Sequence, residues 1–206
     1  VIKIGSSLLA SRDTGLRPEQ IDRLAGEIAV LRSSGREVLI VSSGAIVSGI
    51  RKLGLKEYPK SLPVKQAAAA VGQSRLMWAY EKSFERVDVK VAQILLTHQD
   101  LADRRRFLNA RHTLAALIGF GVIPIINEND TVSVAEIKFG DNDHLAAMLT
   151  NLLQAPLLIL LTSVDGLYSG DPNVDSKAEK VATVSNIDIS VMEMAGDTRS
   201  TLGTGG

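Results

Sequence analysis

Residues 122–130, VIPIINEND, decide the fold class of this chain. Five apolar residues, most of them β-branched, give way at once to four polar ones. A short, continuous apolar run of this kind predicts a strand that is buried on both faces, as in a parallel sheet. Ligands of open parallel sheets bind beyond the carboxyl ends of the strands. The polar residues Asn127, Glu128, Asn129 and Asp130 are therefore candidate ligand contacts.

Outward from this stretch, strand and helix patterns alternate along the whole chain. Strands are predicted over residues 1–4, 37–41, 87–96, 122–126 and 157–161. Helices are predicted from Pro18 to about Gly35, and over residues 45–53, 64–84, 105–118 and 144–153. Strands that alternate with helices in this way indicate an α/β fold whose mainly parallel sheet is covered on both faces.

The composition excludes several classes of function. The 206 residues include 23 Lys and Arg and 23 Asp and Glu, so the net charge is zero, which argues against a nucleic-acid module with a global basic field. There is no Cys, which rules out disulfides, thiolate nucleophiles and Cys-based zinc sites. The three histidines have no metal-ligand spacing, so we expect no metal site. The longest apolar stretch, residues 114–126, is shorter than the ~20 residues that a membrane span needs.

Lys3 is the most informative single residue. It lies among Val1, Ile2 and Ile4 in a predicted strand, and Lys is seldom buried without a partner. Its position alone leaves two interpretations open: an exposed lysine on an edge strand, or a buried functional lysine. The following Gly5 favours the second, because a glycine lets backbone N–H groups approach a phosphate.

Two further segments combine small and polar residues at predicted strand or helix ends. Ser42, Ser43 and Gly44 lead into a helix, where a single Ser would suffice as an N-cap and two followed by Gly favour a ligand. Residues 140–143, GDND, precede another helix and exceed what a cap needs. Acceptors of residues 140–143 and of residues 127–130 could bind a substrate ammonium group, and one carboxylate could orient a lysine. The alternative interpretation of each of these two acidic clusters is a solvated turn.

Eight segments in order give the chain a family resemblance. They are VIKIGSS, IVSSGAI, KQAAAAVGQSRL, DRRRFLNAR, PIINENDTVS, GDNDHLAAM, LTSVDGLY and GTGG. The chain resembles the glutamate 5-kinases of the amino-acid kinase superfamily along nearly its whole length. The resemblance implies a three-layer αβα sandwich with an open, mainly parallel central sheet.

The resemblance also implies a reaction. It is the transfer of the ATP γ-phosphoryl group, with Mg²⁺ on the nucleotide phosphates, to the γ-carboxylate of L-glutamate. The product would be glutamyl 5-phosphate, in the first step of proline biosynthesis. Feedback inhibition by proline, a homodimer or homotetramer, and a cytoplasmic location without membrane or nucleic-acid partners are implied as well. A γ-carboxylate with an ordinary pKa of about 4.3 is already ionised at neutral pH, so no general base is needed.

Carried over residue by residue, the resemblance implies a role for each matching position. Lys3 and Asp143 would be catalytic, with Asp143 orienting lysine. Glutamate would be held by Ser43, Gly44, Asn127, Asp130, Asp141 and Asn142. The nucleotide would be held by Lys3, Gly5, Ser6, Thr162, Ser163, Asp165, Tyr168, Thr204, Gly205 and Gly206.

Family members continue beyond GTGG into a segment with a second catalytic lysine, and many carry an RNA-binding-like C-terminal domain. We therefore expect residues 1–206 to form an amino-acid kinase domain that is incomplete at both ends and lacks that C-terminal domain. By themselves they should have very little kinase activity. The competing interpretations are a non-catalytic sensor of glutamate or proline and, less in keeping with the zero net charge, a nucleic-acid module.

Overall fold

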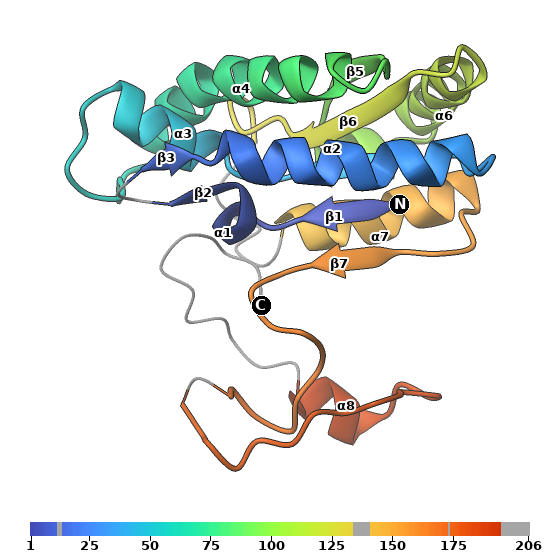
Figure 1. Cartoon of the computed structure of the whole chain (residues 1–206). Coiled ribbons are helices and arrows are strands. Elements are labelled where there is room, and N and C mark those ends of the chain that lie inside the picture. Colours follow the sequence, from blue (N-terminus) through green and yellow to red (C-terminus); the bar gives the residue numbers. More distant parts are fainter. Residues whose placement is uncertain (12–13, 134–140, 173, 195–206) are drawn as a thin grey trace.

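A computed structural model of the chain describes residues 1–11, 14–133, 141–172 and 174–194. Its centre is a parallel sheet of five strands in the order β5-β6-β4-β1-β7 (Figure 1). The strands are β1 (Ile2–Ile4), β4 (Ile40–Ser42), β5 (Val91–Leu96), β6 (Ile123–Glu128) and β7 (Ile159–Leu161). The predicted mainly parallel sheet is confirmed.

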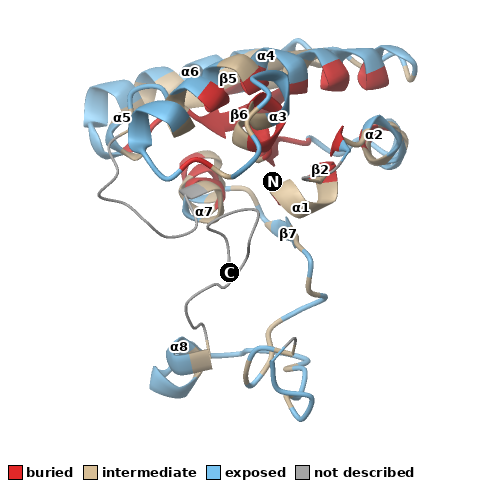
Figure 2. Cartoon of the chain, turned by 90° about the vertical axis from the view of Figure 1, so that its left-hand side faces the viewer, coloured by how far each residue is buried: buried red, intermediate tan, exposed pale blue. Residues whose placement is uncertain are grey.

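Two hydrophobic cores lie on opposite faces of this sheet. Helices α2 (Pro18–Ser33) and α4 (Leu62–Glu85) pack on one face, and α6 (Arg104–Gly119) and α7 (Asp141–Leu153) pack on the other. Neighbouring strand residues divide between the cores: Ile40 and Ile125 face α2 and α4, whereas Val41 and Ile126 face α6 and α7. Figure 2 shows the buried residues concentrated between these layers. The αβα arrangement is therefore the predicted one.

The remaining elements connect these layers. They are α1 (Ser6–Leu9), the antiparallel pair β2 (Ala10–Ser11) and β3 (Gly15–Leu16), α3 (Ala45–Lys52), α5 (His98–Ala102) and α8 (Ile189–Met194). After β7 the chain leads away from the sheet into a largely exposed segment that includes α8 (Figures 1 and 2). In the part of the chain that the structure describes, no helix is both long and apolar enough to cross a bilayer.

Helices α3 and α4 touch each other backbone to backbone. A Cβ atom built on Gly49 would lie 1.7 Å from the carbonyl oxygen of Ala68, and one built on Gly72 would lie 1.8 Å from that of Ala45. Any side chain at either glycine would force the helices apart. The two glycines therefore fix α4 at a short distance from the end of β4.

Several element boundaries differ from the predicted ones. β4 begins at Ile40 instead of residue 37, because the pairing of β1 with β4 starts at Ile2 and Ile40. β5 begins at Val91 because residues 87–89 instead close the end of α4, with Asp88 at φ 54°. β6 runs on through Asn127 and Glu128, which lie opposite Leu95 and Leu96 of β5. β7 starts at residue 159, and α7 starts at Asp141, three residues earlier than predicted.

Candidate active site

The candidate site lies at the carboxyl ends of β1, β4 and β6, beside the first turn of α7. Ile2 and Ile4 of β1 pack into the core formed with α2 and α4, so Lys3 between them points to the α7 face. There its Nζ atom lies 2.7 Å from Oδ1 of Asp143. Lys3 is 5% exposed, and β1 has neighbouring strands on both sides. The interpretation as a buried lysine is confirmed, and the edge-strand alternative is wrong.

Besides its ion pair with Asp143, the Lys3 side chain lies close to the main chain of Gly5. A Cβ atom at Gly5 would lie 3.8 Å from Lys3 Nζ and 3.2 Å from the carbonyl oxygen of Leu161. The Gly5 N–H group donates to that same carbonyl at 2.9 Å. The end of β7, which leads into Thr162 and Ser163, is thereby brought next to the lysine. Ser6 begins α1 directly after Gly5.

Three of the predicted substrate residues form one network of hydrogen bonds. The Asn142 Nδ2 group donates to Ser43 Oγ at 2.9 Å and to Asn127 Oδ1 at 3.0 Å. The backbone N–H of Glu128 donates to Asn127 Oδ1 at 2.9 Å and to Asn142 Oδ1 at 3.3 Å. Asn127 Nδ2 donates in turn to Oε1 of Gln73 on α4, at 2.8 Å. The carboxyl ends of β4 and β6 are thus joined to α7 by side-chain amides.

Ser42 and Ser43, where β4 leads into α3, point their side chains in different directions. Gly44 caps α3 with φ 105°, a backbone conformation that L side chains rarely adopt. Ser43 faces Asn142, as described, and its N–H donates to Ile4. Ser42 faces the opposite way and lies 2.9 Å from the hydroxyl of Tyr80, whose pKa is raised by its burial. Of these two side chains, only that of Ser43 therefore belongs to the site, whereas Ser42 contributes its carbonyl, which accepts from Asn142 Nδ2 at 3.4 Å.

Glu128, one of the candidate ligand contacts, forms a second buried polar group with His98, which the sequence did not single out as a site residue. Ser133 Oγ donates to Glu128 Oε1 at 3.2 Å, and His98 Nδ1 lies 3.5 Å from Glu128 Oε2. The His98 ring packs against that of His144, with 4.8 Å between centroids. His98 was missed because the histidines were considered only for metal-ligand spacing. Gln73 was missed for a different reason, because its contact with Asn127 joins distant parts of the chain.

The structure does not bring all predicted site residues together. Asp165 and Tyr168 lie in the segment that leads away from β7 toward α8 (Figure 1). There Tyr168 Oη donates to Asp165 at 2.6 Å, and Lys180 Nζ donates to it at 2.7 Å. The hydrogen bond from Lys180 is the main cause that lowers the pKa of Asp165 to about 2.

The other predicted positions fall at or beyond the edge of the described site. Asp130 lies just beyond the end of β6 and is partly exposed. Asp141 is the first residue of α7. Thr204, Gly205 and Gly206 lie outside the described residues.

Comparison with known proteins now gives the family. The family model described as "Amino acid kinase family" matches residues 1–206. The chain belongs to the amino acid kinase family. An aspartate kinase from Synechocystis shares the fold, with a TM-score of 0.57 at 14% identity over 86% of this chain and 30% of that chain. This likeness agrees with the αβα layers and the parallel sheet.

Within the amino acid kinase family, the curated relatives are named glutamate 5-kinase. The chain is 58% identical to one from Geobacter metallireducens, 52% to one from Meiothermus ruber and 49% to one from Myxococcus xanthus, each over 206 residues. Each match covers 100% of this chain and 54–55% of the relative. The chain thus spans about half the length of the curated relatives it matches.

Proposed function

We propose that the protein transfers the γ-phosphoryl group of ATP to the γ-carboxylate of L-glutamate and forms glutamyl 5-phosphate. The observation that carries the proposal is the buried Lys3–Asp143 pair beside the amide network of Asn127 and Asn142. Relatives named glutamate 5-kinase, at 49–58% identity, support the choice of substrate.

This site suits a reaction that needs charge neutralisation and alignment. The attacking carboxylate is ionised at neutral pH and requires no general base. Phosphoryl transfer is catalysed mostly by positioning and electrostatics, and a fixed cation is a strong contributor when it is buried. In the proposal, Lys3 stabilises the charge on the transferring phosphoryl group, and Asp143 holds the ammonium group in place. The backbone of Gly5 and Ser6 approaches the phosphates.

We assign glutamate to the network at the ends of β4 and β6. Amide and hydroxyl donors of Asn142, Asn127 and Ser43 suit a carboxylate, and the acids Asp130 and Asp141 suit an ammonium group. Gly44, which follows Ser43 directly, is assigned to the same site. The nucleotide is assigned to Gly5, Ser6 and the residues after β7, namely Thr162, Ser163, Asp165 and Tyr168, together with Thr204, Gly205 and Gly206.

Mg²⁺ would enter this site on the nucleotide. Among the described residues, no group of three His, Asp or Glu side chains could hold a metal ion. Asp143, the acid beside Lys3, is already engaged in the ion pair. Nucleotide phosphates and water would therefore be the main ligands, as is usual for Mg²⁺ in kinases, and the ion would neutralise phosphate charge.

The wider role follows from the resemblance and the relatives. We propose that the reaction is the first step of proline biosynthesis in the cytoplasm, that proline inhibits it, and that the complete protein is a homodimer or homotetramer.

The test is hydroxamate formation by the full-length protein with ATP, Mg²⁺ and hydroxylamine. L-glutamate should give the hydroxamate, whereas L-aspartate, one methylene shorter, should give little. Calorimetry that detects glutamate binding but no nucleotide binding would instead favour a non-catalytic sensor.

A further inference from the structure

We infer that Gln73 is a positioning residue that fixes the orientation of Asn127 and, through it, of Asn142. The inference deepens the proposed function, on which its kinetic test rests. Gln73 lies on α4, outside the predicted site, and does not belong to any strand end. It is 9% exposed, and its Oε1 atom accepts the hydrogen bond from Asn127 Nδ2 at 2.8 Å.

The approach of α4 makes this contact possible. Gly72, the residue before Gln73, is in backbone contact with Ala45 at the start of α3. The turn that carries Ser43 and Gly44 comes directly before Ala45. The close contact between α3 and α4 therefore fixes the position of Gln73 relative to the end of β4. The acceptor oxygen of Gln73 can then reach Asn127, which is 3% exposed.

The orientation of an asparagine amide matters because one end donates and the other accepts. With Asn127 Nδ2 bound to Gln73, Oδ1 must face Asn142 Nδ2 and the Glu128 N–H. If Asn127 were turned over, its NH₂ group would face the Glu128 N–H and the NH₂ group of Asn142 and would find no acceptor there, while its Oδ1 would face Gln73 Oε1. Gln73 and the Glu128 N–H thus hold the two ends of the Asn127 amide in one orientation, Gln73 as the acceptor for Nδ2 and the N–H as the donor to Oδ1.

The same bond determines what the network offers a ligand. Asn142 Nδ2 donates to Ser43 Oγ, to the Ser42 carbonyl and to Asn127 Oδ1, and the last of these bonds forms only while Asn127 presents an oxygen. Loss of the Gln73 acceptor would leave Asn127 Nδ2 without its partner and would loosen the bond from Asn142, which is next to Asp143. Since Gln73 contacts Asn127 and not Lys3, the loss should weaken glutamate binding more than it slows the chemical step.

Two variants of the full-length protein test this inference. Gln73→Met keeps the length of the side chain and removes the acceptor oxygen. Gln73→Asn keeps the amide, shortens it by one methylene and withdraws it from Asn127. Both should raise the glutamate KM about tenfold, as expected for one buried hydrogen bond, with kcat within about threefold. Gln99→Met changes an exposed glutamine on α5 and should leave both constants unchanged.

A double-mutant cycle with Asn127→Ala separates positioning from general damage to the fold. If Gln73 acts through Asn127, the effect of Gln73→Met on KM should vanish in the Asn127→Ala background. Full additivity of the two changes would overturn the inference. Thermal unfolding of each variant checks that the fold is intact, and Gln73→Asn serves if the Met variant does not fold.

Nuclear magnetic resonance gives a readout that does not depend on activity. The side-chain NH₂ signal of Asn127, assigned by its absence in Asn127→Ala, should exchange faster with water in both Gln73 variants than in the wild type. An unchanged exchange rate would overturn the inference even if the wild type phosphorylated no glutamate. Wild-type inactivity with glutamate would by itself contradict only the proposed function.

Discussion

Lys3 and Asp143 lie with Nζ and Oδ1 2.7 Å apart, and this pair joins the first strand of the sheet to the first turn of α7. The lysine side chain is 6% exposed and the aspartate side chain 26%, so solvent reaches the ion pair mainly from the Asp143 side. A buried cation held in this way is preorganised, because it does not need to shed ordered water or change rotamer when charge develops nearby.

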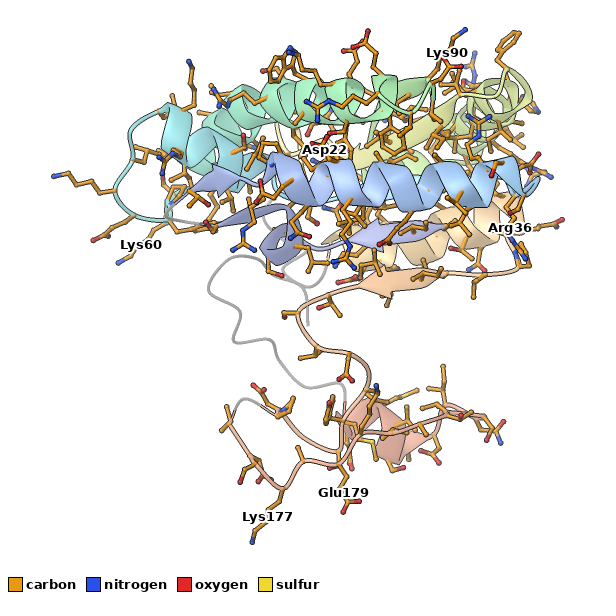
Figure 3. All side chains as sticks on the ribbon, in the orientation of Figure 1. Asp22, Arg36, Lys60, Lys90, Lys177 and Glu179 are labelled. Atoms are coloured by element: carbon orange, nitrogen blue, oxygen red, sulfur yellow. The ribbon has the colours of Figure 1, made fainter. Side chains whose placement is uncertain are left out.

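Lys3→Ala should lower kcat in the full-length protein by roughly 100- to 1,000-fold, the range found when a fixed group that stabilises a transition state is removed. The glutamate KM should change much less, because the charge matters most in the transition state. Steady-state kinetics measure both constants. The control is Lys90→Ala, which removes an exposed lysine (Figure 3) and should leave kcat unchanged. An unchanged kcat in Lys3→Ala would rule out the catalytic role.

Asp143→Asn should lower the free energy of unfolding by about 3–5 kcal/mol, because it leaves the buried Lys3 ammonium without a counter-charge. Urea unfolding at neutral pH measures the change. Asp22→Asn is the matched control, since Asp22 pairs with Arg86 on the surface (Figure 3) and such pairs contribute about 0–1 kcal/mol. Equal losses in the two variants would show that the buried pair is no more important for stability than a surface one.

Gly72→Ala and Gly26→Ala should change stability in opposite directions. A methyl group at Gly72 would overlap the Ala45 carbonyl, so we expect a loss of about 1–3 kcal/mol or more. Gly26 lies within α2 with no atom near its Cβ position, so alanine there should stabilise by about 0.4–1 kcal/mol. Thermal and urea unfolding compare the two. A Gly72→Ala variant as stable as the wild type would contradict the contact that we describe between α3 and α4.

Lys180→Met should raise the pKa of Asp165 from about 2 toward its ordinary value of 3.8. The pKa of the folded state is the lower one, so the stabilising contribution of the carboxylate is present above pH 3.8 and is lost as the pH falls toward 2. A carboxyl titration followed by nuclear magnetic resonance measures the shift. The bond from Tyr168 should keep the pKa of the variant somewhat low, and no rise at all would show that Lys180 is not the main cause.

The layers and most helices could be predicted because they depend on local patterns. Residues 122–126 read as a buried strand, and Pro18 marks the first position of α2. The end of β6 could not be predicted, because Asn127 and Glu128 look like loop residues. They continue the strand because the partners that satisfy their polar groups come from Gln73, Asn142 and Ser133.

Part of the candidate site could also be predicted from local patterns. Strand ends that carry Lys3, Ser43 and Asn127 fall at one edge of any parallel sheet, so their proximity follows from the fold class. The residues alone indicated only that one of several carboxylates could orient a lysine, and the family resemblance implied that this carboxylate is Asp143. Gln73 could not be found, because its importance depends on how closely α4 approaches, and that distance is set by Gly49 and Gly72 against α3.

The strand order has a consequence for the newly made chain. β1 lies between β4 and β7, and β7 ends at Leu161. At about 5–20 residues per second, the ribosome needs on the order of ten seconds to proceed from Lys3 to that strand. Until then β1 is the open edge of an unfinished sheet, the kind of edge that pairs with other chains and aggregates. A charged lysine in its centre disfavours such pairing, so we expect Lys3 to lower the aggregation of the unfinished sheet before Asp143 and β7 enclose it.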